Sequence, residues 1–227
     1  MLGTIINAIA IIVGSLIGIF MRKGISDRYK KIIMQGIPLC IIIIGISNAL
    51  KSNDLMVMIL SVVIGSIIGE TLNIELRLEH LGEYLKSKFK NSNGNFTEGF
   101  ITSSLIYCVG AMAIMGAIES GLTGRYDTLM AKSILDGISS VIFASTFGIG
   151  VMFSAGSVLV YQGAITLFAS SLSKLISEVM VTELSAVGGV LIIGLAFNVL
   201  GVTEEKIKVG NMLPAIFLPV IYYAIIG

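Results

Sequence analysis

Charged side chains are scarce in this chain of 227 residues, in which Asp, Glu, Lys and Arg together make up 13%. A soluble domain carries about 25%. The hydrophobic fraction is 55% and the mean hydropathy is +0.96, so most of the surface requires hydrocarbon rather than water around it. We therefore predict an all-α polytopic membrane protein, since a helix satisfies its backbone polar groups internally. The net charge of +1, without a basic face, argues against a nucleic-acid partner.

Residues that hold metals or perform covalent catalysis are equally rare. The chain has one histidine, His80, and two cysteines, Cys40 and Cys108, which lie in apolar runs without CxxC spacing. We interpret the cysteines as small, reduced, apolar residues of helices. No HExxH, GxSxG or Walker-type sequence occurs, and one histidine leaves little material for a metal site or a Ser–His relay. We expect no enzymatic activity, no cofactor and no metal.

Long hydrophobic runs are what the chain has instead. A transmembrane helix needs about 20 mostly apolar residues, and we expect eight such helices in a single integral membrane domain of residues 1–227. The predicted spans are approximately 3–21, 32–50, 55–73, 98–118, 130–152, 156–173, 184–201 and 210–226. The stretch 130–173 is a more polar central pair. Both two spans with a turn at Ser154-Ala155-Gly156-Ser157 and one re-entrant hairpin fit it.

Basic residues indicate the orientation in the membrane. Most of the 15 Lys and Arg residues fall in the connections after the first, third and seventh spans, which the positive-inside rule places in the cytoplasm. Both termini are then extracytoplasmic. Within the second of these connections, residues 74–90 place Leu78, Leu81 and Leu85 at helical spacing, with charged residues on the other faces. This pattern predicts an amphipathic helix on the cytoplasmic membrane surface, and a docking site for a soluble partner is the alternative.

Small residues recur every four positions in several spans. The ladders include Ala10, Gly14 and Gly18 in the first span and Ser61, Gly65 and Gly69 in the third. In lipid, such ladders let two helix backbones approach each other closely. We therefore predict helix–helix contacts along these faces.

An internal repeat is also indicated, because a shift of 176 residues superposes the first pair of spans on the last pair. The shift places Gln35 on Asn211 and Pro38 on Pro214, so each copy has an amide three residues before a proline. A proline inside a span removes a backbone hydrogen bond. Transporters often carry repeats whose interrupted helices mark the binding site, whereas a simple packing kink is the alternative.

The strongest functional signal comes from the polar central pair and the segment before it. Lys132 and Asp136 place opposite charges at i and i+4 on one helical face. An ionisable residue inside a span usually faces the bundle interior or a water-filled cavity. The candidate residues of a substrate or ion path are Glu119, Lys132, Asp136, Ser139, Ser140, Ser145 and Thr146, with Asn211 and Pro214 on an opposing broken helix. The alternative is a structural ion pair near the membrane surface.

Five blocks of sequence carry a family resemblance. They are GTIIN (3–7), CVGAMAIMGAIESGL (108–122), KSILDG (132–137), FASTFGIGV (143–151) and NMLPA (211–215). Together they extend over nearly the whole chain and resemble the YqgA/YdfK-like "domain of unknown function" family of bacterial inner-membrane proteins. The resemblance implies a multi-pass protein of the bacterial cell membrane without soluble domains, and it implies no substrate.

We expect a secondary transporter or permease for a small polar or anionic solute, with the lipid bilayer and a solute or coupling ion as partners. The sequence has no nucleotide site, so coupling would use an ion gradient or none. A non-transporting scaffold or regulator that uses residues 74–90 is one alternative, and a passive channel is another. A homo-oligomer is compatible with the sequence, which fixes no oligomeric state.

Overall fold

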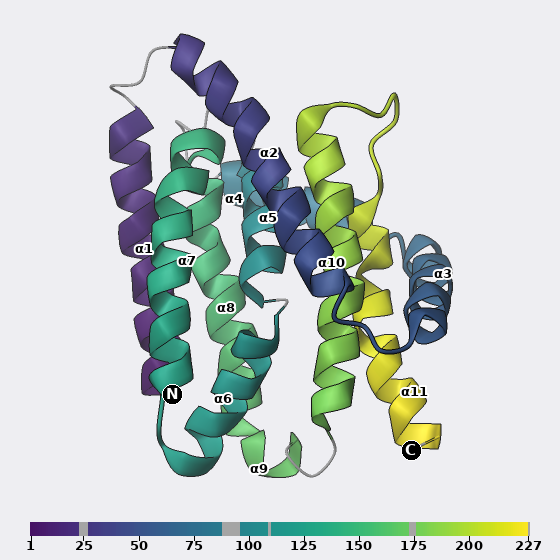
Figure 1. The fold of residues 1–227 in the computed structure, drawn as a ribbon. Coiled ribbons are helices and arrows are strands. Elements are labelled where there is room, and N and C mark those ends of the chain that lie inside the picture. The colour runs from purple at the N-terminus through teal and green to yellow at the C-terminus, as the bar shows by residue number, and fades with distance from the viewer. Residues whose placement is uncertain (23–26, 88–95, 109, 173–175, 227) are drawn as a thin grey trace. The chain divides into compact units, whose positions relative to one another are not determined.

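The computed structural model describes residues 1–22, 27–87, 96–108, 110–172 and 176–226, and these residues form helices and turns without any strand. Contacts divide the chain into two units. Unit 1 comprises Met1–Ile33 and Tyr84–Lys174, and unit 2 comprises Met34–Glu83 and Leu175–Gly227. The helical membrane class predicted from composition is confirmed (Figure 1). The single domain expected over the whole chain stays a prediction.

Unit 1 is built around three long helices that run side by side (Figure 1). They are α1 (Leu2–Arg22), α7 (Asp127–Phe147) and α8 (Gly150–Leu167). Three shorter helices pack against α8, namely α5 (Phe96–Cys108), α6 (Ala111–Thr123) and α9 (Ala169–Leu172). Apolar side chains such as Ile11, Leu129 and Val151 are fully buried between these helices.

Glycines on α1 bring that helix into backbone contact with α7. A Cβ atom at Gly14 would collide with the carbonyl oxygen of Gly137, and one at Gly18 would collide with that of Val141. Two helices approach this closely only where small residues face each other. The ladder predicted in the first span is therefore confirmed as a packing surface.

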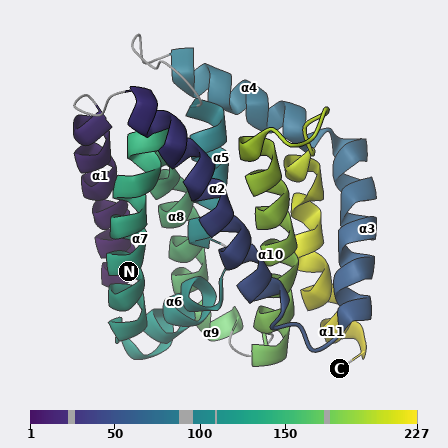
Figure 2. The same cartoon turned by 45° about the horizontal axis from the view of Figure 1, so that its top comes forward.

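Unit 2 surrounds α10 (Glu178–Leu200), whose most apolar stretch is 72% buried, more than any other candidate span among the described residues. The other elements of the unit are α2 (Asp27–Ala49), α3 (Leu55–Leu72), α4 (Ile74–Ser87), η1 (Val209–Phe217) and α11 (Leu218–Ile226). The helices α3, α10 and α11 run side by side, as Figure 2 shows. The border between the units falls within α2 and α4.

Unit 2 uses small residues in the same way. A Cβ atom at Gly69 would collide with the carbonyl group of Asn211, and one at Gly65 with the backbone of Ala215. Both contacts lie between α3 and the 3-10 helix η1. The ladder predicted in the third span is therefore also confirmed.

The turn predicted at 154–157 is wrong, because α8 runs through these residues without a break. The chain instead turns between α7 and α8 at Gly148, whose φ of 82° is a conformation that residues with a Cβ atom rarely adopt. Ser154 and Ala155 are small because they are buried within unit 1, and the Ser154 hydroxyl donates to the Val151 carbonyl at 2.6 Å. Small side chains there serve packing rather than a turn.

Five described helices are long and apolar enough to cross a membrane. They include both α7 and α8, which favours two spans over one re-entrant hairpin in the central pair. The span predicted at 98–118 is not straight, because α5 and α6 meet at an angle of 58° and form either one broken span or a re-entrant loop. The apolar helices Gln35–Ala49 and Val209–Ile225 are shorter. The count of eight spans stays a prediction.

The amphipathic segment forms the helix α4 over residues 74–87, and 88–90 lie outside the described residues. Asn73 separates α4 from α3 with a left-handed conformation at φ 51°. α4 therefore turns away from α3 rather than continuing it (Figure 2). Its position at the membrane surface stays a prediction.

The predicted repeat agrees with the bounds of one helix pair. A shift of 176 residues moves Leu2–Arg22 onto 178–198, within α10. The second pair differs, since α2 is an α-helix through Pro38, whereas Pro214 lies in the 3-10 helix η1. The interrupted helix therefore occurs in one copy, and the repeat itself stays a prediction.

Candidate functional site

An ion pair lies in the interior of unit 1. Lys132 and Asp136 are one turn apart on α7, and the Lys132 Nζ atom lies 2.9 Å from Asp136 Oδ1 and 2.7 Å from Oδ2. Only 7% of Lys132 and 6% of Asp136 is exposed. Both side chains are thus buried among the helices of unit 1, whereas the depth of the pair in a membrane stays a prediction.

Amide side chains from the two neighbouring helices complete this arrangement. Asn7 on α1 donates from Nδ2 to Asp136 Oδ2 at 3.0 Å and to Gln162 Oε1 on α8 at 3.3 Å. Both amides are fully buried. We call Asn7, Lys132, Asp136 and Gln162 the polar cluster, because they link the three long helices of unit 1 through polar atoms.

Hydroxyl groups extend the polar cluster in two directions. Thr4 and Thr166 lie one turn away on α1 and α8, with their hydroxyls 3.5 Å apart. On the other side, Ser140 follows Asp136 by one turn of α7 and lies 2.8 Å from the hydroxyl of Tyr107 on α5. A polar strip therefore runs along the inside of unit 1.

Several buried polar atoms near this strip have no hydrogen-bond partner among the described residues. They are Asn7 Oδ1, Ser15 Oγ, Thr102 Oγ1, Ser103 Oγ, Thr146 Oγ1 and Gln162 Nε2. Burying such an atom without a partner costs about 1–3 kcal/mol, so folded proteins pair nearly all of them. All six belong to unit 1. Two of these atoms, Asn7 Oδ1 and Gln162 Nε2, belong to the polar cluster.

The residues predicted on α7 divide into two groups. Lys132, Asp136 and Ser140 are brought together in the interior. Ser139 and Ser145 instead donate to carbonyl oxygens of their own helix, Ser139 to those of Leu135 and Asp136 and Ser145 to that of Ile142. Hydroxyl groups in helices often bond to the preceding turn in this way.

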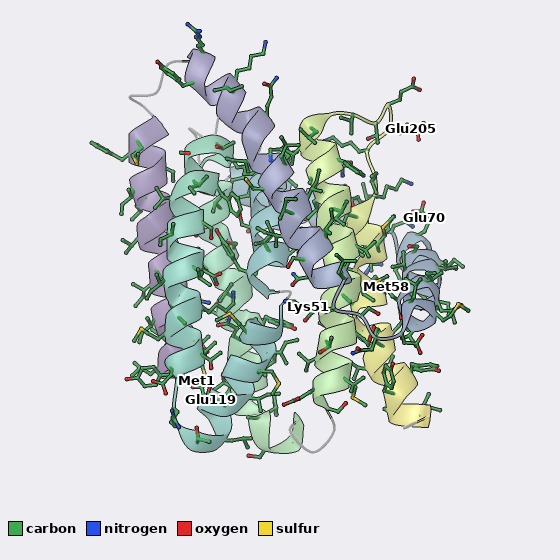
Figure 3. All side chains as sticks on the ribbon, viewed as in Figure 1. Met1, Lys51, Met58, Glu70, Glu119 and Glu205 are labelled. Atoms are coloured by element: carbon green, nitrogen blue, oxygen red, sulfur yellow. The ribbon has the colours of Figure 1, made fainter. Side chains whose placement is uncertain are left out.

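Glu119 lies on α6, towards the end of unit 1 where Met1 is also labelled in Figure 3. Its carboxylate accepts a hydrogen bond from the Thr128 hydroxyl at 2.7 Å, which fastens α6 to the start of α7. Thr146, near the other end of α7, has a hydroxyl without a partner. Neither residue contacts the ion pair.

Asn211 and Pro214 belong to unit 2 and lie in η1. Asn211 donates to Glu70 Oε2 at 2.6 Å and accepts the backbone N–H of Glu75 at 2.7 Å, so it ties η1 to α3 and α4. Beside it is an open cavity of about 440 Å³ that includes Ser66, Glu70 and Lys208 in its lining. The expectation that these two residues oppose the polar helix stays a prediction.

Three members of the site were missed in the sequence. Asn7 follows Thr4 by three residues, Tyr107 follows Ser103 by four, and Gln162 lies four residues before Thr166 and eight after Ser154. The spacing of these α8 residues places them on one helical face, which is the signal that could have found Gln162. Thr4, Asn7 and Ser15 have a similar spacing on α1, and all three are fully buried.

Within the described ranges, no three His, Cys, Asp or Glu side chains gather as metal ligands would. The polar cluster is suited instead to electrostatic recognition. It combines an ammonium group, a carboxylate and two amides in an apolar helical bundle. Such a group can bind a small polar or charged molecule through charge-assisted hydrogen bonds.

A bundle of apolar helices with a charged interior defines an integral, multi-pass membrane protein. The chain belongs to the family of proteins of unknown function DUF554, whose model matches residues 2–224. It is 37% identical to the uncharacterized membrane protein YdfK of Bacillus subtilis over 96% of this chain and 94% of that protein. It is 28% identical to the uncharacterized protein YqgA of Escherichia coli, with the same coverage. The family resemblance is confirmed, and no solved structure matches.

Proposed function

We propose that the protein is a secondary transporter or permease for a small polar or anionic solute, and that the polar cluster in unit 1 binds this solute. The observation that carries the proposal is the buried Lys132–Asp136 pair beside two amides that each keep an unpaired atom. The proposal contains no catalytic step.

A structural role alone accounts poorly for this arrangement. Taking two charges out of water costs several kcal/mol per ion, and well-packed apolar residues in their place are often equally stable or more so. The unpaired atoms Asn7 Oδ1 and Gln162 Nε2 add to that cost. An interior that holds charges and spare hydrogen-bonding atoms is expected where a solute must replace its own hydration.

The test is a thermal-shift screen of the purified protein against small polar and ionic solutes. A ligand at 100 times its Kd stabilises the folded state by about 2.7 kcal/mol, which is roughly 5–10 °C in Tm for a chain of this size. We expect such shifts for a narrow class of solutes. Uptake of a hit into proteoliposomes then distinguishes transport from binding alone.

Two variants assign the binding to the polar cluster. The double variant Lys132→Met/Asp136→Leu removes both charges and should lose the shift. Asp127→Asn is the matched control, because Asp127 lies on the same helix but is an exposed partner of Arg125. A solute that shifts wild type and the double variant equally does not bind at the cluster. If every hit behaved so, the proposed function would be wrong.

A further inference from the structure

We propose that the polar cluster binds a small monovalent carboxylate together with one proton, which Asp136 takes up. The inference rests on the proposed function and names the solute class and the coupling ion of the same site. It follows from the way in which Lys132 is paired, from the donors around Asp136 and from the charge of the whole cluster.

The ammonium group of Lys132 is committed to Asp136. Its hydrogen bonds among the described residues go to the two carboxylate oxygens of that residue. An anion that enters the cluster must take the place of the Asp136 carboxylate beside Lys132. The displaced carboxylate then lies in an apolar interior without a cation, and a buried acid in that position takes up a proton rather than stay charged.

Charge neutrality fixes the stoichiometry. The cluster is neutral with Lys132 positive and Asp136 negative. It is neutral again when Lys132 is positive, Asp136 is a protonated acid and the guest is a monovalent anion. A divalent anion with one proton would leave a net negative charge in the interior, which is strongly unfavourable. One proton and one monovalent anion therefore bind as a neutral pair.

The donors around Asp136 specify the class of anion. Lys132 Nζ and Asn7 Nδ2 already converge on a carboxylate, that of Asp136 itself, at 2.7–3.0 Å. Gln162 Nε2 is a third buried donor and has no partner among the described residues. A guest carboxylate can accept from the same two donors and can also use the amide of Gln162. The spare donor thus favours a guest over the resident side chain.

The helices that pack against α7 carry other titratable side chains. On α1 the titratable side chain is that of Arg22, the last residue of the helix. The remaining groups are Glu98, Tyr107 and Cys108 on α5, Glu119 on α6 and Tyr161 on α8. Tyr107 bonds to Ser140 and Glu119 bonds to Thr128. Asp136 is the acid in contact with Lys132, and it is therefore the group whose protonation an anion controls.

The experiment uses formate as the probe, since it stays ionised from about pH 5.5 to about pH 7.5, with chloride at equal ionic strength as the comparison. Binding to the purified full-length protein is measured by calorimetry at both pH values. Proton uptake is measured in weakly buffered solution. We expect formate to bind about tenfold more tightly for each unit by which the pH falls, with close to one proton taken up per formate.

Variants separate the proton from the anion. Asp136→Asn removes the acid, so a proton that it takes up with formate can go only to Lys132, which has lost its counter-charge in the buried interior. The double variant Lys132→Met/Asp136→Leu should bind no formate, and Asp127→Asn should behave as wild type. Because Asp136→Asn can lose stability, the proton count on wild type provides a test that does not depend on that variant.

Three results would overturn the inference: formate binding to wild type that ignores pH, formate binding without proton uptake, and no formate binding at either pH. Chloride binding as tight as formate binding would overturn the carboxylate class. None of these results removes the proposed function, which fails separately if no solute in the thermal-shift screen depends on the polar cluster.

Discussion

The two units treat their buried polar side chains differently. In unit 2, Glu183 is fully buried on α10, and it accepts hydrogen bonds from the Ser52 hydroxyl at 2.6 Å and the Asn53 backbone at 2.7 Å. Asn198 likewise both donates to and accepts from the backbone of Ile207 at 2.8 Å. These side chains fasten connections between helices. In unit 1, polar side chains join one helix to another, and six buried side-chain atoms have no partner among the described residues.

This difference distinguishes polar groups that hold the fold together from polar groups that could receive a solute. A polar group that holds a loop is satisfied by backbone atoms and needs no further partner. A polar group that receives a solute must keep an atom available, and the fold bears the cost when the solute is absent. Asn7 and Gln162 fit the second description at the polar cluster, whereas both carboxylate oxygens of Glu183 accept hydrogen bonds from Ser52 and Asn53.

The largest loss of folded protein is expected at the glycines between helices, which both units use for close packing. Gly14→Leu in unit 1 and Gly69→Leu in unit 2 should each prevent recovery of folded protein, because each side chain would overlap a backbone carbonyl. Gly156→Leu is the matched control, since no atom lies within 4 Å of a Cβ atom at that position. Yield and size-exclusion profile give the readout. Normal behaviour of the Gly14 variant would show that α1 and α7 do not pack as described.

The second-largest effect is the loss of stability expected when the Lys132–Asp136 ion pair of unit 1 is broken. Asp136→Asn leaves Lys132 buried without a counter-charge and should lower the free energy of unfolding by about 3–5 kcal/mol. Lys132→Met/Asp136→Leu should restore it to within about 1–2 kcal/mol of wild type, because both charges are gone. Denaturation in detergent measures both, with Asp127→Asn as the exposed control. A double variant no more stable than the single one would mean that the pair is not isolated in an apolar interior.

The contrast between the two units can be tested at two amide side chains, Gln162 in unit 1 and Asn198 in unit 2. Gln162→Leu removes an Nε2 atom without a partner among the described residues, but it also removes the acceptor of the 3.3 Å hydrogen bond from Asn7. Its net effect on stability should therefore stay below about 1 kcal/mol, while it weakens solute binding. Asn198→Leu breaks two hydrogen bonds to Ile207 and should lower stability by about 1–3 kcal/mol without affecting binding. The melting temperature of each variant, measured with and without solute, tests this contrast. A loss of stability in Gln162→Leu as large as that in Asn198→Leu would erase the distinction between the units.

The sequence predicted what depends on local pattern. Composition was sufficient for the helical membrane class, and the i, i+4 spacing was sufficient to find Lys132 and Asp136. It could not reveal that Asn7 reaches Asp136, because that contact joins residues 129 positions apart. The turn at 154–157 was misplaced because small residues serve both turns and close helix packing, whereas the actual turn depends on the single conformation of Gly148.

The smallest effect is expected at the surface pair of unit 2. Lys208 lies 2.8 Å from Glu70, and both side chains are more than half exposed. The hydrogen bond to Glu70 raises the pKa of Lys208 above its usual value. Since the folded state holds this proton more tightly, the pair contributes stability that is present at neutral pH and is lost as the pH rises through the raised pKa. The Tm of Lys208→Met should therefore lie slightly below that of wild type at neutral pH.

Wild type and Lys208→Met should converge once the pH has risen past the raised pKa of Lys208, where the lysine loses its charge. High salt at neutral pH should also bring them together, because water and ions screen an exposed pair. Tm measured against pH, with and without salt, gives the comparison. The buried pair of unit 1 should show no such salt dependence, as its charges are shielded from the solvent. A large, salt-resistant loss in Lys208→Met would place this pair with the buried one and contradict the contrast between the two units.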